Sequence, residues 1–240
     1  MSLVLFDIDG TLLHARGLGV RAMETAGRTM WPSFSLESIE IAGCIDTLIW
    51  RAAAERAGVP DPDAQQERFR SAYATALAAL IDEPGEGSGV VHAIPGAPEL
   101  VAAVREREGL GLGVLTGNYP ETGRMKLTAA GFDLDHFMVE AWGCDAQSRR
   151  GLPPVAMDRF RARWGRDVAP ADVVIIGDTP HDIDCAHANG CRAIAVASGM
   201  FDRAALADHE PDLLLDDLGD TARLVAWIES GSTHAAAEEH

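Results

Sequence analysis

The chain has 240 residues, of which 47% are hydrophobic and 24% charged, a balance typical of a globular protein with one core or a core and a smaller companion domain. Its net charge of −17 repels nucleic-acid backbones and anionic membranes, and no apolar run reaches the roughly 20 residues of a membrane span. We therefore expect no nucleic-acid partner and no association with a membrane. The N-terminal segment MSLVLFDIDG lacks the basic region of a signal peptide, which predicts a cytoplasmic location.

Short apolar runs that end in polar or glycine-containing turns predict six strands, at residues 3–8, 110–115, 137–140, 173–176, 193–197 and 213–215. Amphipathic stretches between and after these runs predict helices at residues 97–107, 120–130, 154–164, 182–189 and 218–229. Strands that alternate with helices in this way predict an α/β fold built on a doubly wound parallel sheet. In such sheets ligands bind beyond the carboxyl ends of the strands.

Residues 15–92 interrupt this alternation, because they show helical patterns and almost no strand signal. The alanine-rich stretch 65–81 predicts a helix, and the glycine-rich stretch 83–89 predicts a loop. We interpret residues 15–92 as an all-helical cap domain inserted into a core of residues 1–14 and 93–232, with hinges near 13–18 and 85–95. The remaining residues, 233–240, are predicted to be a disordered tail. A cap inserted after the first strand would cover the ligand-binding edge of the sheet.

The first predicted strand ends in two carboxylates separated by one residue, Asp7 and Asp9, followed by Gly10 and Thr11. Side chains two residues apart leave an extended chain on the same face, so these carboxylates repel each other unless a cation or a shared proton lies between them. Magnesium binds such groups and keeps other coordination positions for water and phosphate. Gly10 allows a tight turn whose backbone amides can meet an anion.

Two further strand ends carry polar groups. Thr116, Gly117 and Asn118 close the second predicted strand and precede a helix whose N-terminus favours phosphate. Asp178 and Asp182 follow the fourth predicted strand and add two carboxylates. Because parallel strands end at one edge, these groups and those after the first strand are predicted to form a single site.

The only lysine of the chain is Lys126; the other 19 basic residues are arginines. A lysine ammonium can neutralise a nucleophilic carboxylate and a transferring phosphoryl group. Arg149 and Arg150 are alternatives for the same role. The four cysteines, Cys44, Cys144, Cys185 and Cys191, match neither a CxxC pair nor a zinc-site spacing, which favours buried thiols. For His181 the sequence favours a solvated histidine in a turn.

The three strand-end motifs, Asp7-x-Asp9-Gly10-Thr11, then Thr116, then Gly177-Asp178-x-x-x-Asp182, resemble in this order the motifs of the haloacid dehalogenase superfamily. The resemblance covers essentially the whole chain. The helical insertion resembles that superfamily's C1-type cap on a Rossmann-like core. Four features resemble phosphoglycolate-phosphatase-like members most closely: Thr116-Gly117-Asn118, Lys126-Leu127, Gly43 and Asp46-Thr47.

The resemblance implies a phosphatase that uses Mg²⁺ as its cofactor. Asp7 would be the nucleophile that forms an aspartyl-phosphate, and Asp9 the general acid and then the general base. The metal ligands would be Asp7, Asp178, Asp182 and Asp9, the last through its backbone carbonyl. Phosphate would be bound by Gly10, Thr11, Thr116, Gly117 and Asn118.

The remaining implications concern the cap and the third motif. Gly43 and Asp46 of the cap would contact the substrate, although without the resemblance they equally fit the start of a helix. We assign the role of the catalytic lysine to Lys126, because residues 148–154, where the family has its usual lysine, contain arginines but no lysine. The identity of this positive partner stays open between Lys126 and Arg149 or Arg150.

We therefore predict a phosphatase of the haloacid dehalogenase superfamily that hydrolyses a small phosphorylated metabolite. The alternatives on the same fold are a sugar-phosphate mutase and a 2-haloacid dehalogenase; the latter would leave Asp9 and the acidic motif without a task. A non-catalytic binding protein is disfavoured, because all the acidic residues are present. Phosphoglycolate is the substrate that the resemblance favours, but Cys44-Ile45 differs from related sequences. The sequence leaves open a monomer or a homodimer.

Overall fold

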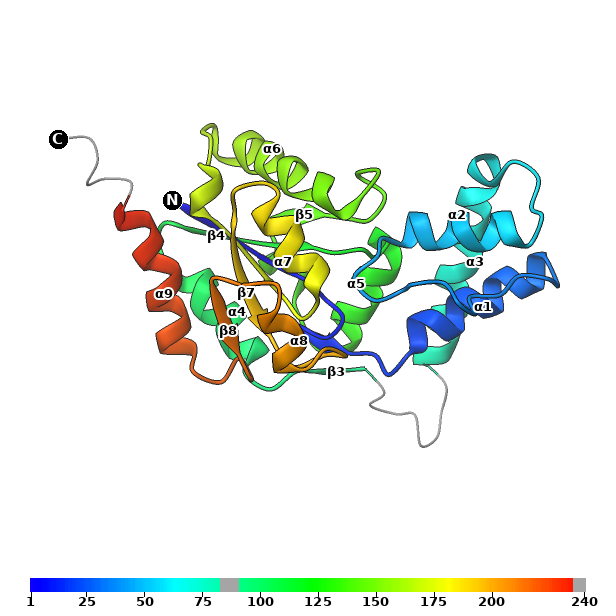
Figure 1. Ribbon diagram of the computed structural model, residues 1–240, viewed down its shortest axis with the longest axis horizontal. Coiled ribbons are helices and arrows are strands. Elements are labelled where there is room, and N and C mark those ends of the chain that lie inside the picture. Colours follow the sequence, from blue (N-terminus) through cyan, green and yellow to red (C-terminus); the bar gives the residue numbers. More distant parts are fainter. Residues whose placement is uncertain (83–90, 235–240) are drawn as a thin grey trace.

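A computed structural model describes residues 1–82 and 91–234 of the chain (Figure 1). Its main sheet has six parallel strands in the order β5-β4-β1-β6-β7-β8. The strands are β1 (Ser2–Phe6), β4 (Leu110–Leu115), β5 (Val139–Ala141), β6 (Val173–Gly177), β7 (Arg192–Val196) and β8 (Leu213–Leu215). The predicted α/β fold with a doubly wound parallel sheet is thereby confirmed.

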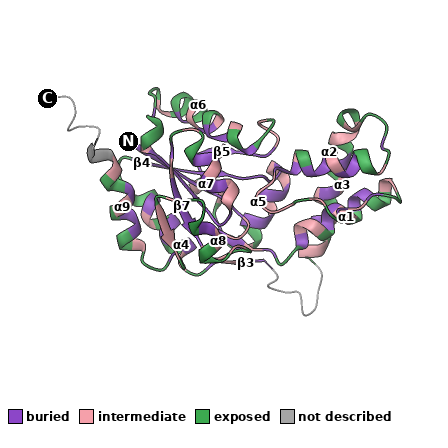
Figure 2. Ribbon diagram, viewed as in Figure 1, coloured by how far each residue is buried: buried purple, intermediate pink, exposed green. Residues whose placement is uncertain are grey.

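The sheet is buried on both faces, as parallel sheets are when helices cover them. Val4 and Phe6 of β1 point into one hydrophobic cluster, whereas Leu3 and Leu5 point into the other. The first face is covered by α4 (Ala97–Glu106) and α9 (Thr221–His234), and the second by α6 (Leu152–Trp164) and α7 (Pro180–His187). Figure 2 shows the strands buried between these two layers.

Three central strands end level with one another, which places their following residues at one edge. Phe6 of β1 pairs with Val114 of β4 and with Ile176 of β6. The residues that follow these positions therefore meet at the carboxyl end of the sheet. The shorter elements are α5 (Pro120–Ala129), α8 (Arg203–Ala207) and the 3₁₀ turns Leu134–His136, Arg149–Gly151 and Pro170–Asp172.

The helices of the insertion are α1 (Leu18–Met30), α2 (Asp46–Arg56) and α3 (Pro62–Ile81), which lie together beyond α5 (Figure 1). They pack around buried aromatic rings, with Trp50 and Phe69 stacked at 4.1 Å between centroids. The α3 helix begins after Asp61, which accepts a hydrogen bond from the Ala64 amide, and Pro62 occupies its first position. Both features favour a helix start there.

Almost no strand is predicted between residues 14 and 92, and in the described part of that range strand residues occur only at its two ends. Two short strands, β2 (Leu13–His14) and β3 (His92–Ala93), form an antiparallel pair where the chain enters and leaves the helical insertion. A two-residue strand is too short to produce a recognisable alternation of apolar and polar residues. This pair holds together the two chain segments that connect the sheet to the helical insertion.

Some predicted boundaries are displaced by local turn chemistry. The first strand ends at Phe6 and not at residue 8, because a turn closed by Gly10 begins there. The helix predicted at 182–189 begins at Pro180, since Thr179 and Asp182 form a capping box before it. Helix α9 extends to His234 and thus includes the first two residues of the predicted tail. The predicted loop 83–89, part of the second hinge and residues 235–240 lie outside the described residues.

In the part of the chain that the structure describes, no helix combines the length and the apolar character that crossing a membrane requires.

Candidate active site

An acidic cluster lies at the carboxyl end of the central strands. It consists of Asp7 after β1, Asp178 after β6 and Asp182 in α7, whose carboxylate oxygens lie within 4.8 Å of one another. All three side chains are buried. Asp182 is fixed by the α7 cap, because its Oδ2 accepts hydrogen bonds from the Thr179 amide at 3.1 Å and the Thr179 hydroxyl at 2.7 Å. The structure thus brings together three of the predicted metal ligands.

Burial makes this concentration of negative charge costly. Burial raises the pKa of Asp7 to about 6; Arg149 opposes the rise, while Asp182 and Asp9 add to it. The pKa of Asp178 is raised well above its ordinary value by burial and by the charges of Asp7 and Asp182. A divalent cation fits such a set, because all its donors are carboxylate oxygens, the ligands preferred by magnesium-type ions.

Arg149 is the cation that faces the acidic cluster. Its Nη2 lies 3.1 Å from Asp7 Oδ1 and also contacts Asp182, while its Nη1 donates to the Gly43 carbonyl at 3.1 Å. The guanidinium is buried, and among the described residues its Nε has no hydrogen-bond partner. Arg150, by contrast, is exposed and pairs with Asp184. Of the three basic residues considered from the sequence, Arg149 is therefore the one in contact with Asp7.

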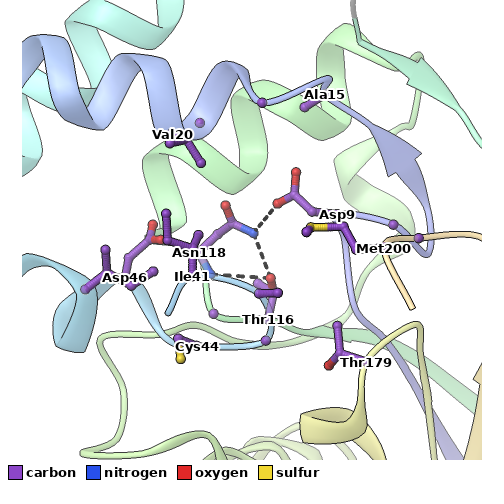
Figure 3. A pocket seen from close by; sticks show the side chains of 18 of the residues that line it. Asp9, Ala15, Val20, Ile41, Cys44, Asp46, Thr116, Asn118, Thr179 and Met200 are labelled. Atoms are coloured by element: carbon purple, nitrogen blue, oxygen red, sulfur yellow. Dashed lines mark hydrogen bonds between the residues drawn. The ribbon is translucent and has the colours of Figure 1, made fainter. Parts of the chain in front are cut away.

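Asp9 occupies a separate position in the same site. Its Oδ2 accepts a hydrogen bond from Lys126 Nζ at 2.6 Å. It also accepts one from Asn118 Nδ2 at 2.9 Å (Figure 3). Because β1 ends at Phe6, the alternation of an extended strand does not extend to Asp9, and its carboxylate lies outside the acidic cluster of the described residues. At this position the predicted metal ligand is therefore the backbone carbonyl of Asp9 and not its side chain.

Lys126 lies in α5 next to the helical insertion, and its ammonium group pairs with the Asp9 carboxylate. Its side chain is 4% exposed, and its Nζ also donates to Asn118 Oδ1 at 2.7 Å. Gly19 of α1 lies directly above it, because a Cβ atom at that position would stand 3.2 Å from both Lys126 Nζ and the Tyr73 hydroxyl. The insertion thus shields the lysine from water and strengthens its pairing with Asp9.

The predicted phosphate-binding residues lie beside the acidic cluster and beside Asp9. Thr116 Oγ1 accepts a hydrogen bond from Asn118 Nδ2 at 2.8 Å (Figure 3). Thr11 is fully buried and lies within hydrogen-bond distance of Asp178, with 3.3 Å between Oγ1 and Oδ1. Gly10 has a φ of 84°, and a Cβ atom there would collide with the Asp178 carboxylate. Glycine is therefore required for the turn and for the approach of Asp178.

A cavity of about 730 Å³ separates the strand ends from the helical insertion. Its floor includes Asp7, Asp9 and Thr116. The opposite wall is largely aliphatic, and Figure 3 shows Val20 and Ile41 on this side. These wall residues are not predictable from the sequence, because an aliphatic side chain in a cavity wall follows the same pattern as one in a core.

Both predicted cap contacts, Gly43 and Asp46, line this cavity. Asp46 is buried, and its Oδ2 accepts the Tyr119 amide at 3.0 Å, which ties α2 to the start of α5. Burial raises the pKa of Asp46 to about 7, against the opposing effects of Lys126 and of the hydrogen bond from Tyr119. The Asp46 amide donates in turn to the Gly117 carbonyl at 2.7 Å. Asp46 therefore joins the insertion to the sheet.

Comparisons with known proteins agree with this geometry. Residues 150–221 match the HAD-hydrolase-like family. A phosphoglycolate phosphatase of Mannheimia succiniciproducens is 28% identical over 93% of this chain and 97% of its own. A hydrolase from Pseudomonas syringae has a similar structure, with a TM-score of 0.64 and 22% identity over 95% of this chain and 98% of its own. A putative β-phosphoglucomutase from Bacteroides vulgatus has a TM-score of 0.67 and 18% identity over 96% and 90% of the two chains.

The family-model match, the curated relatives and the strand-end motifs all relate this chain to the haloacid dehalogenase superfamily. The same relatives support a hydrolase of the phosphatase type. The predicted recognition, which came from the three strand-end motifs, is thereby confirmed. The arginine at position 149 distinguishes this haloacid dehalogenase homologue from the lysine pattern that the sequence resemblance led us to expect.

Proposed function

We propose that this haloacid dehalogenase homologue is a cytoplasmic, Mg²⁺-dependent phosphatase that hydrolyses a small phosphate monoester through an aspartyl-phosphate on Asp7. One observation carries the proposal. Asp7 lies in a cluster of three carboxylates, whereas Asp9 is held apart by Lys126 at 2.6 Å, and both line one cavity. Two neighbouring carboxylates in different surroundings suit two different roles, a nucleophile and a proton carrier.

The first step forms a bond between a carboxylate oxygen of Asp7 and the phosphorus atom, while the bond from phosphorus to the ester oxygen breaks. The leaving alkoxide takes a proton from Asp9. Because Lys126 and Asn118 both bind Oδ2 of Asp9, they orient this carboxyl group, and Oδ1 is the oxygen that we assign to proton transfer.

The second step reverses the role of Asp9. A water molecule gives a proton to Asp9 and attacks the phosphorus atom, and the bond from phosphorus to Asp7 breaks. Inorganic phosphate leaves and the carboxylate of Asp7 is regenerated. Splitting one difficult displacement into two steps is the general advantage of a covalent intermediate. The insertion, residues 15–92, would act as a cap that keeps other water away during both steps.

Arg149 is the positive partner that we assign to the phosphoryl group. It stands against Asp7 at 3.1 Å and is buried, so its charge acts at low dielectric. Its guanidinium holds Asp7 in place and faces the position where the transferred oxygens would lie. By the resemblance, Thr116 and the backbone amides of Gly117 and Asn118 would supply further donors, whereas the Gly10 amide donates to the Leu13 carbonyl at 2.8 Å.

Asp7, Asp178 and Asp182, with the Asp9 carbonyl, would hold the magnesium ion. When bound, magnesium supplies a positive charge that stabilises the phosphoryl oxygens and offsets the repulsion among the carboxylates. The raised pKa values of Asp7 and Asp178 support this, because burial and mutual repulsion raise them even though Arg149 opposes the rise, and a bound cation would favour the charged carboxylates. Phosphoglycolate is the first substrate to test, since it is what curated relatives are named for.

The test is hydrolysis of p-nitrophenyl phosphate and phosphoglycolate by the wild type and by Asp7→Asn, with magnesium or with EDTA. We expect activity only for the wild type with magnesium. Acid quenching during turnover should trap a phosphoryl group on a peptide that contains residue 7. Activity that survives both EDTA and the substitution would contradict the proposal. Conversion of a sugar phosphate into its isomer without release of phosphate would indicate a mutase instead.

A further inference from the structure

A second group of metal-binding side chains lies outside the acidic cluster. It consists of Glu40 and Cys44, in the segment before α2, and His181 in the first turn of α7. One ligand atom from each residue lies within 4.8 Å of the other two. Within residues 1–82 and 91–234, this group and the acidic cluster are the sets of three or more such residues that meet this condition. The two groups share no residue.

The contacts of this group show that it is already partly assembled. His181 Nε2 lies 3.2 Å from Glu40 Oε1. Gly43, adjacent to Cys44, has a φ of 73°, and a Cβ atom there would collide with the His181 imidazole. Glycine at this position therefore lets the imidazole approach the cysteine. Arg149 holds the same segment by donating to the Gly43 carbonyl at 3.1 Å.

The donor types differ from those of the acidic cluster. A thiolate, an imidazole and a carboxylate are the ligands of zinc, whereas magnesium prefers oxygen alone. Ligand atoms around a tetrahedral zinc ion stand about 3.3–3.8 Å apart, given bonds of about 2.0–2.3 Å. His181 Nε2 and Glu40 Oε1 already stand at 3.2 Å, and all three ligand atoms lie within 4.8 Å of one another. Three protein ligands leave the fourth position for water.

We propose that Glu40, Cys44 and His181 form a zinc-type metal site that joins the helical insertion to the core. Glu40 and Cys44 belong to the insertion, and both line the cavity, together with Ile39, Ile41, Ala42 and Gly43. A zinc ion bound to His181 of the core would hold this wall of the cavity in place. Zinc would then slow the opening of the cavity without entering the acidic cluster.

This site is not predictable from the sequence, because its spacing is not that of a zinc motif. Cys44 and His181 lie far apart in the chain, and the sequence favours a buried thiol for the first and a solvated turn histidine for the second. Only the packing of the insertion against α7 brings them together.

The experiment uses cobalt(II) as a spectroscopic substitute for zinc. The full chain is saturated with magnesium to fill oxygen-only sites and is then titrated with cobalt(II). A cobalt–thiolate bond gives a near-ultraviolet charge-transfer band that carboxylates cannot give. We expect this band with one equivalent of cobalt, its loss on addition of zinc, and its absence in Cys44→Ser. The matched control is Cys144→Ser, which removes another half-buried free cysteine and should keep the band.

Two further variants test whether His181 and Glu40 bind the metal together with Cys44. In His181→Ala and Glu40→Gln we expect zinc affinity, measured by competition with cobalt, to fall at least about tenfold. Glu40→Gln alters an exposed side chain, so it tests the site even if another variant fails to fold. Absence of the band in the wild type, its persistence in Cys44→Ser, or unchanged affinity in both other variants would overturn the proposal. Because the readout is metal binding, it is independent of the proposed phosphatase activity.

Discussion

The guanidinium of Arg149 stands 3.1 Å from Asp7 Oδ1. Arg149 lies in a 3₁₀ turn before α6, and Asp7 follows the central strand β1. Both side chains are only 7% exposed. Since the same guanidinium also contacts Asp182, one arginine holds together the proposed nucleophile and one proposed metal ligand.

Replacing Arg149 by methionine should lower kcat/KM about 10²–10³-fold, the usual loss when one preorganised donor to a transition state is removed. Lysine at this position should restore part of the activity, because it returns the charge without the forked geometry. The measurement is hydrolysis of p-nitrophenyl phosphate at saturating magnesium. Arg150→Met is the control, since Arg150 is exposed and pairs with Asp184. Equal losses in the two variants would rule out a specific role for Arg149.

Replacing Lys126 by methionine should slow substrates with poor leaving groups more than substrates with good ones. Lys126 orients Asp9 through a contact of 2.6 Å, and Asp9 is the proposed acid for the leaving alkoxide. An alkyl phosphate needs that proton, whereas p-nitrophenolate leaves without much help. We therefore expect kcat/KM to fall at least about tenfold further for an alkyl phosphate than for p-nitrophenyl phosphate. A uniform loss across both substrates would argue that Lys126 is only structural.

Magnesium should stabilise the folded protein through the acidic cluster. A ligand at 100 times its Kd adds about 2.7 kcal/mol to the free energy of unfolding. The expected result is a rise in Tm for the wild type that is largely lost in Asp178→Asn. Asp184→Asn should behave like the wild type, because Asp184 lies outside the cluster and pairs with Arg150. The same rise in Asp178→Asn as in the wild type would place magnesium elsewhere.

Replacing Gly10 by alanine should damage both stability and the site. Backbone strain at a positive φ costs about 1 kcal/mol for a residue with a Cβ atom. At Gly10 that atom would also displace the Asp178 carboxylate. Gly58→Ala is the matched control, because Gly58 has a φ of 70° but no atom within 4 Å of an added Cβ. Denaturant unfolding and magnesium binding should therefore separate the two variants, with only Gly10→Ala losing magnesium affinity.

The buried Asp46 should make stability fall as pH rises. Its pKa is raised from 3.8 to about 7 in the folded protein. Between about pH 4 and pH 7 the unfolded chain has lost this proton and the folded protein has kept it, so unfolding becomes easier as pH rises. Below pH 4 and above pH 7 the contribution of Asp46 is constant.

Asp46→Asn removes this titration and keeps an oxygen that can accept the Tyr119 amide. We therefore expect the difference in free energy of unfolding, variant minus wild type, to increase from about pH 4 to about pH 7. The measurement is denaturant unfolding across that range. Asp63→Asn, an exposed partner of Arg51, should show no comparable trend. A pH-independent difference for Asp46→Asn would show that Asp46 does not titrate in this window.

The sequence by itself determined the sheet and the position of the acidic residues along it. The apolar run 110–115 coincides with β4, because burial on both faces leaves a continuous hydrophobic pattern. The run 213–215 coincides with β8, an edge strand whose residues are half-buried. The glycine and acidic residues that end β1 and β6 identify where a parallel sheet gathers its ligands. Those local patterns, with the superfamily resemblance, were enough to place Asp7, Asp178 and Asp182 together.

Only the tertiary structure decided which cation meets which carboxylate. Arg149 reaches Asp7 and Lys126 reaches Asp9, although the sequence offered Lys126 and the two arginines as alternatives for one role. The partner of a long side chain depends on how helices and turns distant in sequence pack, to within a few ångströms, and no local periodicity records that distance. The same reason explains why the short strands β2 and β3 and the group Glu40, Cys44 and His181 came to light only in three dimensions.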